Sequence, residues 1–277
     1  MVVVHFWCTT NAMQKFWRIL KKILAVTAVV ACAALFVVVL TSAVQKQEQL
    51  TCKNLQIKID YDSGIAFVNE SEIKERINFL SGENVVGKEL QRIDFRTLET
   101  EVEKNPFVDE AEIFVDQQQN LMIEIVQKRP ILRILNNDGV GYYLSENNER
   151  IPLCDKFTPH VAVALGNVVT GEGTKRDSTV QSALFSLIKV IRVDSFLNAL
   201  VDQIYVAENG EMELVPRITG HTIRFGKPDE NTTQKFEQLK VFYNEGMKKV
   251  GWYKYKTIDL RFTNQVVCIK NDTTKIN

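Results

Sequence analysis

The fold is decided by residues 105–130, which read NPFVDEAEIFVDQQQNLMIEIVQKRP. Residues 108–115 and 121–127 within this stretch carry apolar side chains at the spacing of strands that bury one face. The polar residues between the two runs favour turns, so the pair is expected to form a hairpin. Pro106 separates the hairpin from a preceding helix, and Pro130 is expected to end the second strand because it lacks a backbone amide.

The residues before the hairpin predict one further strand and two helices. Residues 54–60 alternate in polarity as a strand does. Asn69, which is followed by a glutamate three residues later, is expected to cap one helix, and Asp94 is expected to cap a second helix that ends before Pro106. The order strand, helix, helix, strand, strand over residues 50–130 indicates a small α+β domain.

The residues that follow, 131–270, predict a β-rich domain with flanking helices. A helix capped by Asp177 or Ser178 and a long helix over residues 231–250 each place apolar residues along one side. The last strand is expected to run unbroken over residues 257–270. Further strands are expected at residues 141–144, 150–153, 160–165, 203–207, 211–217 and 221–225.

An uncharged apolar run of 22 residues, 23–44, lies near the N-terminus. At about 1.5 Å per residue it spans about 33 Å, which is enough to cross a hydrocarbon core of about 30 Å. Residues 1–22 contain four lysines or arginines and no acidic residue, the charge bias of a cytoplasmic tail. The run is longer than the apolar core of a cleaved signal peptide, which has about 7 to 15 residues. We therefore expect a retained single-pass helix, with the bulk of the chain extracytoplasmic and a short C-terminal tail at residues 271–277.

Composition and motifs argue against several classes of function. The 34 basic and 34 acidic residues balance, so no basic field indicates nucleic-acid binding. The three histidines lack metal-ligand spacing, and no nucleophile elbow, zinc-protease motif or phosphate-binding glycine loop occurs. The cysteines after the apolar run are Cys52, Cys154 and Cys268, an odd number without a Cys-x-x-Cys pair. The sequence therefore predicts no cofactor, no metal, no small-molecule substrate and no disulfide framework.

Four stretches of the sequence resemble the FtsQ/DivIB family of bacterial cell-division proteins. Residues 105–111 (NPFVDEA) and 121–130 (LMIEIVQKRP) are similar to its POTRA domain, and residues 141–144 (GYYL) and 258–262 (IDLRF) to its second, β-rich exterior domain. The resemblance implies an α+β protein with one N-terminal transmembrane helix, a POTRA-like domain and a β domain. It also implies a non-enzymatic scaffold of the inner (plasma) membrane. Such a scaffold holds other divisome membrane proteins, FtsB-like and FtsL-like, at the septum during peptidoglycan synthesis.

Two other functions stay open from the sequence. A type II membrane enzyme, such as an extracytoplasmic transferase, would need a convergent polar site. The nearest acidic motif, Asp60-Tyr61-Asp62, lies where a turn alone explains the aspartates. An outer-membrane assembly factor would carry several POTRA domains or a barrel, and neither is visible in the sequence.

The resemblance also implies that the C-terminal region binds the FtsB-like partner. In the expected strand 257–270, apolar and polar residues alternate, which predicts one buried and one solvated face. A terminal strand at a sheet edge can accept a strand from another protein, whereas an internal strand is already paired on both sides. Arg261 is expected to face solvent and meet an acidic partner residue, and Phe262 to support the edge from the apolar side. The candidate partner-binding residues are Ile258, Asp259, Leu260, Arg261, Phe262, Thr263, Asn264, Gln265 and Val266.

Overall fold

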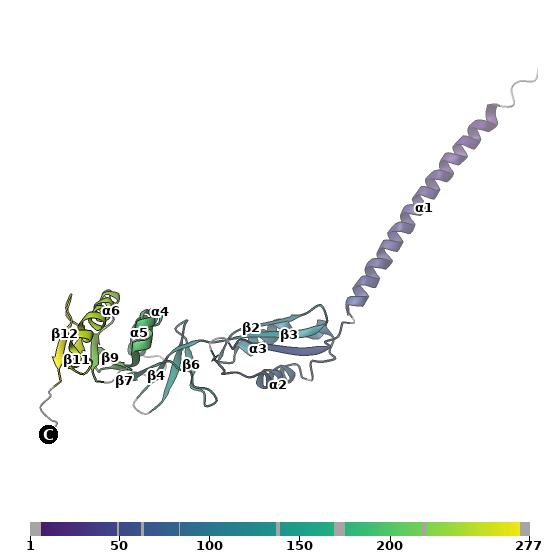
Figure 1. Ribbon diagram of the computed structural model, residues 1–277. Helices are drawn as coiled ribbons and strands as arrows, with labels where there is room; N and C mark the ends of the chain where they lie inside the picture. Colours follow the sequence, from purple (N-terminus) through teal and green to yellow (C-terminus); the bar gives the residue numbers. More distant parts are fainter. Residues whose placement is uncertain are drawn as a thin grey trace, which may run out of the picture.

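The computed structural model describes residues 7–48, 50–61, 64–82, 84–136, 139–168, 175–217 and 220–271. Its first element, helix α1 (Trp7–Glu48), extends away from all the strands (Figure 1). The part of α1 from Phe16 to Ser42 is long enough and apolar enough to cross a membrane, and the described residues contain one such helix. The expected membrane run, residues 23–44, lies within α1.

Three strands and two helices follow in the predicted order. The strands form a sheet of order β1-β3-β2, in which β1 is parallel and β2 antiparallel to β3. The side chain of Asn69 accepts a hydrogen bond from the amide of Glu72 (2.9 Å), which confirms the first predicted helix cap. Asp94 accepts one from the amide of Thr97 (3.1 Å), which confirms the second. The elements are β1 (Asn54–Ile59), α2 (Glu70–Leu80), the 3₁₀ turn η2 (Leu90–Arg92), α3 (Phe95–Glu103), β2 (Val108–Val115) and β3 (Asn120–Gln127).

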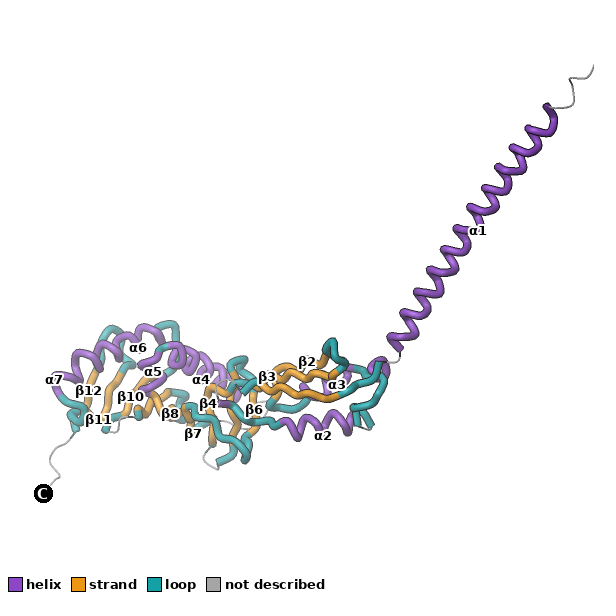
Figure 2. Tube along the Cα trace, turned by 45° about the vertical axis from the view of Figure 1, so that its right-hand side comes forward, coloured by secondary structure: helices purple, strands orange, loops and turns teal. Residues whose placement is uncertain are grey.

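Nine strands form a second sheet, in the order β12-β11-β10-β9-β8-β7-β4-β5-β6. Helices cover one face of this sheet, as Figure 2 shows, and Leu187 of α4 and Phe236 of α6 share a core with Ile258 of β11. The strands are β4 (Pro130–Leu135), β5 (Gly141–Ser145), β6 (Arg150–Pro152), β7 (Ala162–Gly166), β8 (Val201–Val206), β9 (Met212–Pro216), β10 (Thr222–Gly226), β11 (Tyr255–Asp259) and β12 (Val267–Lys270). The helices are α4 (Lys175–Val193), α5 (Ser195–Leu200) and α6 (Thr232–Val241), which continues through a π-helical turn, η3 (Phe242–Met247), into α7 (Lys248–Val250).

Two predicted roles were wrong. Strand β3 ends at Gln127, as predicted, but Pro130 begins β4 instead of ending a strand. A proline can occupy the first position of a strand without breaking the ladder of hydrogen bonds. Helix α4 begins at Lys175, so Asp177 and Ser178 lie inside the helix and neither is its cap.

The two sheets share an apolar core. Tyr143 of β5 and Ile151 of β6 are 1% and 0% exposed, and both pack among the residues that bury the three-stranded sheet. The ring centroid of Phe67 lies 5.0 Å from that of Phe107 and 6.1 Å from that of Tyr143. Phe157 meets the Phe67 ring edge-on at 5.3 Å. The nine-stranded sheet therefore contributes side chains to the core of its neighbour.

One buried side chain holds the loop that carries Phe67. The Oε1 atom of Gln127 accepts hydrogen bonds from the amides of Phe67 (2.9 Å) and Val68 (3.0 Å). Its Nε2 atom donates to the carbonyls of Asp60 (3.0 Å) and Ile65 (3.1 Å). Because Gln127 is 3% exposed, water cannot easily replace these bonds, and the last residue of β3 fixes the path of the loop.

Candidate partner-binding surface

The predicted site, residues 258–266, does not form one strand. Strands β11 and β12 form an antiparallel hairpin, and the residues between them turn, with Asn264 in the left-handed region at φ 61°. Asparagine adopts that conformation more readily than most residues, which lets the chain reverse here. The expected unbroken strand over residues 257–270 was therefore wrong.

Burial divides the predicted residues into two groups. Ile258, Asp259 and Leu260 are 0%, 4% and 0% exposed. β11 is an internal strand, paired with β10 on one side and β12 on the other. The prediction of an edge strand is therefore wrong for residues 258 and 259, which lie in β11. Residues 261–265 are exposed, and Val266 is half-buried against the helix-covered core. Phe262, within the exposed group, is 46% exposed and does not support the sheet from its apolar side.

Arg261 is already engaged by two carboxylates. Its Nη2 atom lies 2.7 Å from Oδ2 of Asp259, and its Nη1 atom lies 3.2 Å from Oε2 of Glu211. Burial acts to raise the pKa of Asp259, but hydrogen bonds from the Arg261 side chain and amide outweigh it and hold that pKa below its ordinary value. The Asp259 carboxylate in turn raises the pKa of Arg261. Arg261 is exposed, as predicted, but the acidic residues that it meets belong to this chain, and its bonds fix the turn that follows β11.

Strand β12 is the edge of the sheet at this end. It pairs with β11 on one side, and the described residues place no strand on its other side. The amide of Asn271 donates to the carbonyl of Lys254 (2.9 Å), in the direction of β11. Because amides alternate along a strand, those of Cys268 and Lys270 are directed away from β11. We call this free side of residues 267–270 the β12 edge.

The side chains of β12 differ between its two faces. Val267 and Ile269 are 38% and 46% exposed and lie on the face without helices, because Cys268, which alternates with them, packs on the helix-covered core. Burial raises the pKa of the Cys268 thiol, so the thiol stays protonated at neutral pH. The sequence predicted an edge for the terminal strand as a whole, but only its last part, β12, lies at the edge, and the predicted residues 258 and 259 belong to the internal strand β11. The signal that could have found this division is the polar run at residues 263–265, in the middle of the expected strand.

Two of the other sheet edges are poorly suited to strand addition. On β2, the amide of Ile113 donates to a carboxylate oxygen of Glu99 (2.9 Å), and the amide of Ala111 to one of Glu103 (3.4 Å), both on α3. The edge strand β6 has only three residues. Of the remaining edges, β1 lies at the α1 end of the molecule and β12 at the opposite end (Figure 1).

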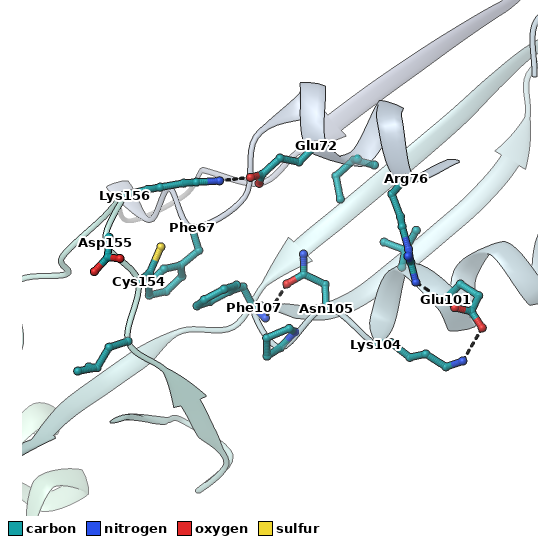
Figure 3. A pocket seen from close by; sticks show the side chains of 14 residues that line it. Phe67, Glu72, Arg76, Glu101, Lys104, Asn105, Phe107, Cys154, Asp155 and Lys156 are labelled. Carbon is teal, nitrogen blue, oxygen red and sulfur yellow. Dashed lines mark hydrogen bonds and ion pairs between the residues drawn. The ribbon is translucent and has the colours of Figure 1, made fainter. Parts of the chain in front are cut away.

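A surface cavity of about 610 Å³ lies beside α2 and the end of α3, and the segment after β6 closes its other side (Figure 3). Phe67 and Phe107 contribute apolar surface to it, and Cys154 lines it. Five of its six charged side chains are engaged with one another, so the cavity presents little unpaired charge to a ligand. The ion pairs are Lys156 with Glu72, Arg76 with Glu101 (3.2 Å) and Lys104 with Glu101.

The acidic motif at residues 60–62 does not gather metal ligands in the described residues. Among the described parts of the chain, no group of three or more His, Cys, Asp or Glu residues could hold a metal ion. Asp60 lies 3.8 Å from the guanidinium of Arg129. Asp62, the other aspartate of the motif, lies outside the described residues.

Comparison with known proteins gives a match for each of the two regions that follow α1. Residues 50–126 match a POTRA-like domain, and residues 129–269 match the family described as FtsQ/DivIB, C-terminal related. A search of curated proteins found no match. The resemblance and the fold class predicted from the sequence are confirmed. FtsQ/DivIB proteins are non-enzymatic proteins of cell division. Because the second match covers just over half of the 277 residues, the chain belongs to the FtsQ/DivIB family and has a role in cell division.

Proposed function

We propose that this chain is a membrane-anchored, non-enzymatic scaffold that holds other divisome membrane proteins at the septum while peptidoglycan is built. Family membership supports the setting in cell division. The apolar helix α1 supports anchoring in the inner membrane. The four basic residues and absent acidic residues of segment 1–22 support an orientation with this segment in the cytoplasm and both sheets outside.

The β12 edge is the single observation that carries the binding function. The amides of Cys268 and Lys270 are directed away from β11, and Val267 and Ile269 present apolar surface beside them. An edge of this kind accepts an extended segment through main-chain hydrogen bonds, while side chains at alternate positions supply specificity. We assign the edge to the FtsB-like partner, with the FtsL-like protein in the same assembly. The exposed residues 261–265 adjoin β12 and extend the surface.

The test replaces Lys270 with two residues that differ in one backbone group. Lys270→Pro removes the amide directed away from β11, whereas Lys270→Ala removes the same side chain and keeps the amide. The full chain is co-expressed with its FtsB-like and FtsL-like partners, extracted in detergent and captured on an affinity tag. We expect the proline variant to lose the FtsB-like partner and the alanine variant to retain it.

Thermal melting of each variant controls for damage to the fold. Proline is tolerated in edge strands, so both variants should melt close to the native chain. If Lys270→Pro keeps its partner and its melting temperature, strand addition at β12 is refuted. If both variants lose the partner equally, removal of the amide adds nothing to removal of the side chain, and strand addition is again refuted.

A further inference from the structure

Exposed lysines gather where β12 ends, next to α7 and the start of β11. Between residues 246 and 271 the single acidic residue is Asp259, which is buried and bound by Arg261. Among the described residues, none of these lysines takes part in an ion pair. We call this group the basic rim, and its members are Lys248, Lys249, Lys254, Lys256 and Lys270.

The pairing of β11 with β12 brings part of the rim together. Lys270 lies opposite Tyr255, whose chain neighbours are Lys254 and Lys256. The carbonyl of Lys254 accepts the amide of Asn271, so the chain on both sides of Lys270 is held against this bend. Cationic side chains from both strands therefore lie at the same end of the β12 edge.

The side on which Lys270 projects is also defined. Lys270 alternates with Ile269, so it lies on the side of Cys268, which packs on the helix-covered core. Met247, the residue before α7, is buried in that same core, so α7 and its two lysines lie on this side too. The two sides of β12 therefore differ in chemistry. The side without helices is apolar at Val267 and Ile269, whereas the helix side carries Lys270 and the two lysines of α7. Lys254 and Lys256 flank Tyr255, which packs on the helix-covered core, so they extend the rim at the end of the edge and are not assigned to the helix side.

Lysines on an edge strand protect it against unwanted pairing, and this role alone would explain Lys270. It does not explain why the cations continue onto α7, which contributes no strand edge. A strand with carboxylates toward the helix side and apolar residues toward the other side would match both surfaces. Opposite charges on neighbouring strands are favourable, and like charges are unfavourable.

We propose that the β12 edge selects an acidic strand, one whose alternate residues are carboxylates on the helix side, where Lys248, Lys249 and Lys270 lie, and apolar on the side of Val267 and Ile269. This rests on the proposed function, in which β12 accepts a strand from a partner. The lysines do not create the main-chain pairing. They decide which strand is accepted, because a basic strand is repelled and a neutral one gains nothing from them.

A polypeptide fits the rim better than a lipid surface does. Figures 1 and 2 both place β12 at the end of the molecule opposite α1, the helix that is apolar enough to cross a membrane. A membrane that holds α1 therefore lies at the other end from the rim. The apolar residues beside the rim, Val267 and Ile269, belong to a strand with free amides, which lipids cannot pair as a strand does.

The test uses the full chain in zwitterionic detergent and three short synthetic peptides labelled with a fluorophore. Valine alternates with glutamate in the first peptide, with glutamine in the second and with lysine in the third. The native chain should bind the glutamate peptide most tightly and the lysine peptide least. Lys248→Glu combined with Lys270→Glu should weaken binding of the glutamate peptide by roughly tenfold and leave the glutamine peptide unchanged. Lys53→Glu with Lys74→Glu is the control, because both lysines are exposed and lie far along the chain from β12.

Each result separates the charge proposal from the strand proposal. Equal binding of the glutamate and glutamine peptides overturns charge selection but leaves strand addition standing. Failure of all three peptides to bind, together with partner capture by Lys270→Pro, overturns both. Equal weakening by the control pair assigns the effect to net charge and overturns a specific rim. Displacement of the glutamate peptide by vesicles of anionic lipid assigns the lysines to a membrane surface instead.

Discussion

Removal of the buried Gln127 side-chain amide should lower the free energy of unfolding by an amount that follows from its four hydrogen bonds. Gln127→Ala removes the partner of the Phe67 and Val68 amides and of the Asp60 and Ile65 carbonyls. The bonds to Phe67, Val68 and Ile65 are buried, whereas the carbonyl of Asp60 is partly accessible to water. A buried group left without a partner costs about 1 to 3 kcal/mol, so three such groups imply a loss of at least about 3 kcal/mol in the free energy of unfolding.

Hydrogen exchange followed by mass spectrometry is the assay, because it reports where the loss occurs. We expect faster exchange over residues 60–68 and over the segment that meets Phe67, with α4 and α6 unchanged. Gln127→Glu is the matched variant, since it keeps an acceptor for the two amides and loses the donor to the two carbonyls. Its defect should be smaller at about pH 5 than at about pH 8, because protonation restores a donor. A loss below about 0.5 kcal/mol, or faster exchange spread evenly over both sheets, would show that Gln127 is not what holds the loop.

Three further predictions concern pH, the β2 edge and topology. Burial lowers the pKa of His221, which contacts the hydroxyl of Tyr243, so the unfolded chain binds the proton more readily than the folded chain. The contribution of neutral His221 to the free energy of unfolding is therefore fully present above about pH 6.5 and is lost as the pH falls below that value. His221→Gln should flatten this pH dependence of the melting temperature. Glu99→Ala with Glu103→Ala frees two β2 amides and should cause self-association in sedimentation experiments, and a monomeric variant would contradict the capping role. Alkaline phosphatase fused to the C-terminus should be active, since it works only outside the cytoplasm, and an inactive fusion with an active cytoplasmic reporter at the same place would reverse the orientation.

Local signals were enough to predict the strands and helices α2 and α3 of the first sheet's domain, but not the parallel pairing of β1 with β3. The caps at Asn69 and Asp94 and the hairpin formed by β2 and β3 each depend on residues close together in the sequence. The helix α5 was missed even though Asp194 caps it by accepting the amides of Phe196 (2.9 Å) and Leu197 (3.1 Å). Six residues are too few to show a helical period, so the cap was the only signal available.

The candidate site was harder to predict because its environment is not local. Thr257 and Asp259 are 5% and 4% exposed, although their polarity made one face of the strand look solvated. β10 pairs with β11 in parallel, and Arg224 lies directly beside Asp259 in that register. β10 is separated from β11 in the sequence by the helix α6 and its continuation. The polarity pattern of residues 257–270 therefore does not indicate that β10 covers this side of β11. The turn at Asn264 could be predicted from residue types, but the order of the strands could not.

The shared core gives the molecule a fixed length. Tyr143 and Ile151 are buried in the neighbouring sheet's core, so the two sheets cannot swing about the short link at residues 128–129. The separation of β1, near the membrane helix, from β12, at the far end, is then set by packed side chains and not by a flexible tether. In the proposed function, a protein captured on β12 is therefore held at a constant distance from β1, and tension applied to it passes through both sheets. The two packed sheets then act as a strut that keeps whatever binds β12 away from the α1 end of the molecule.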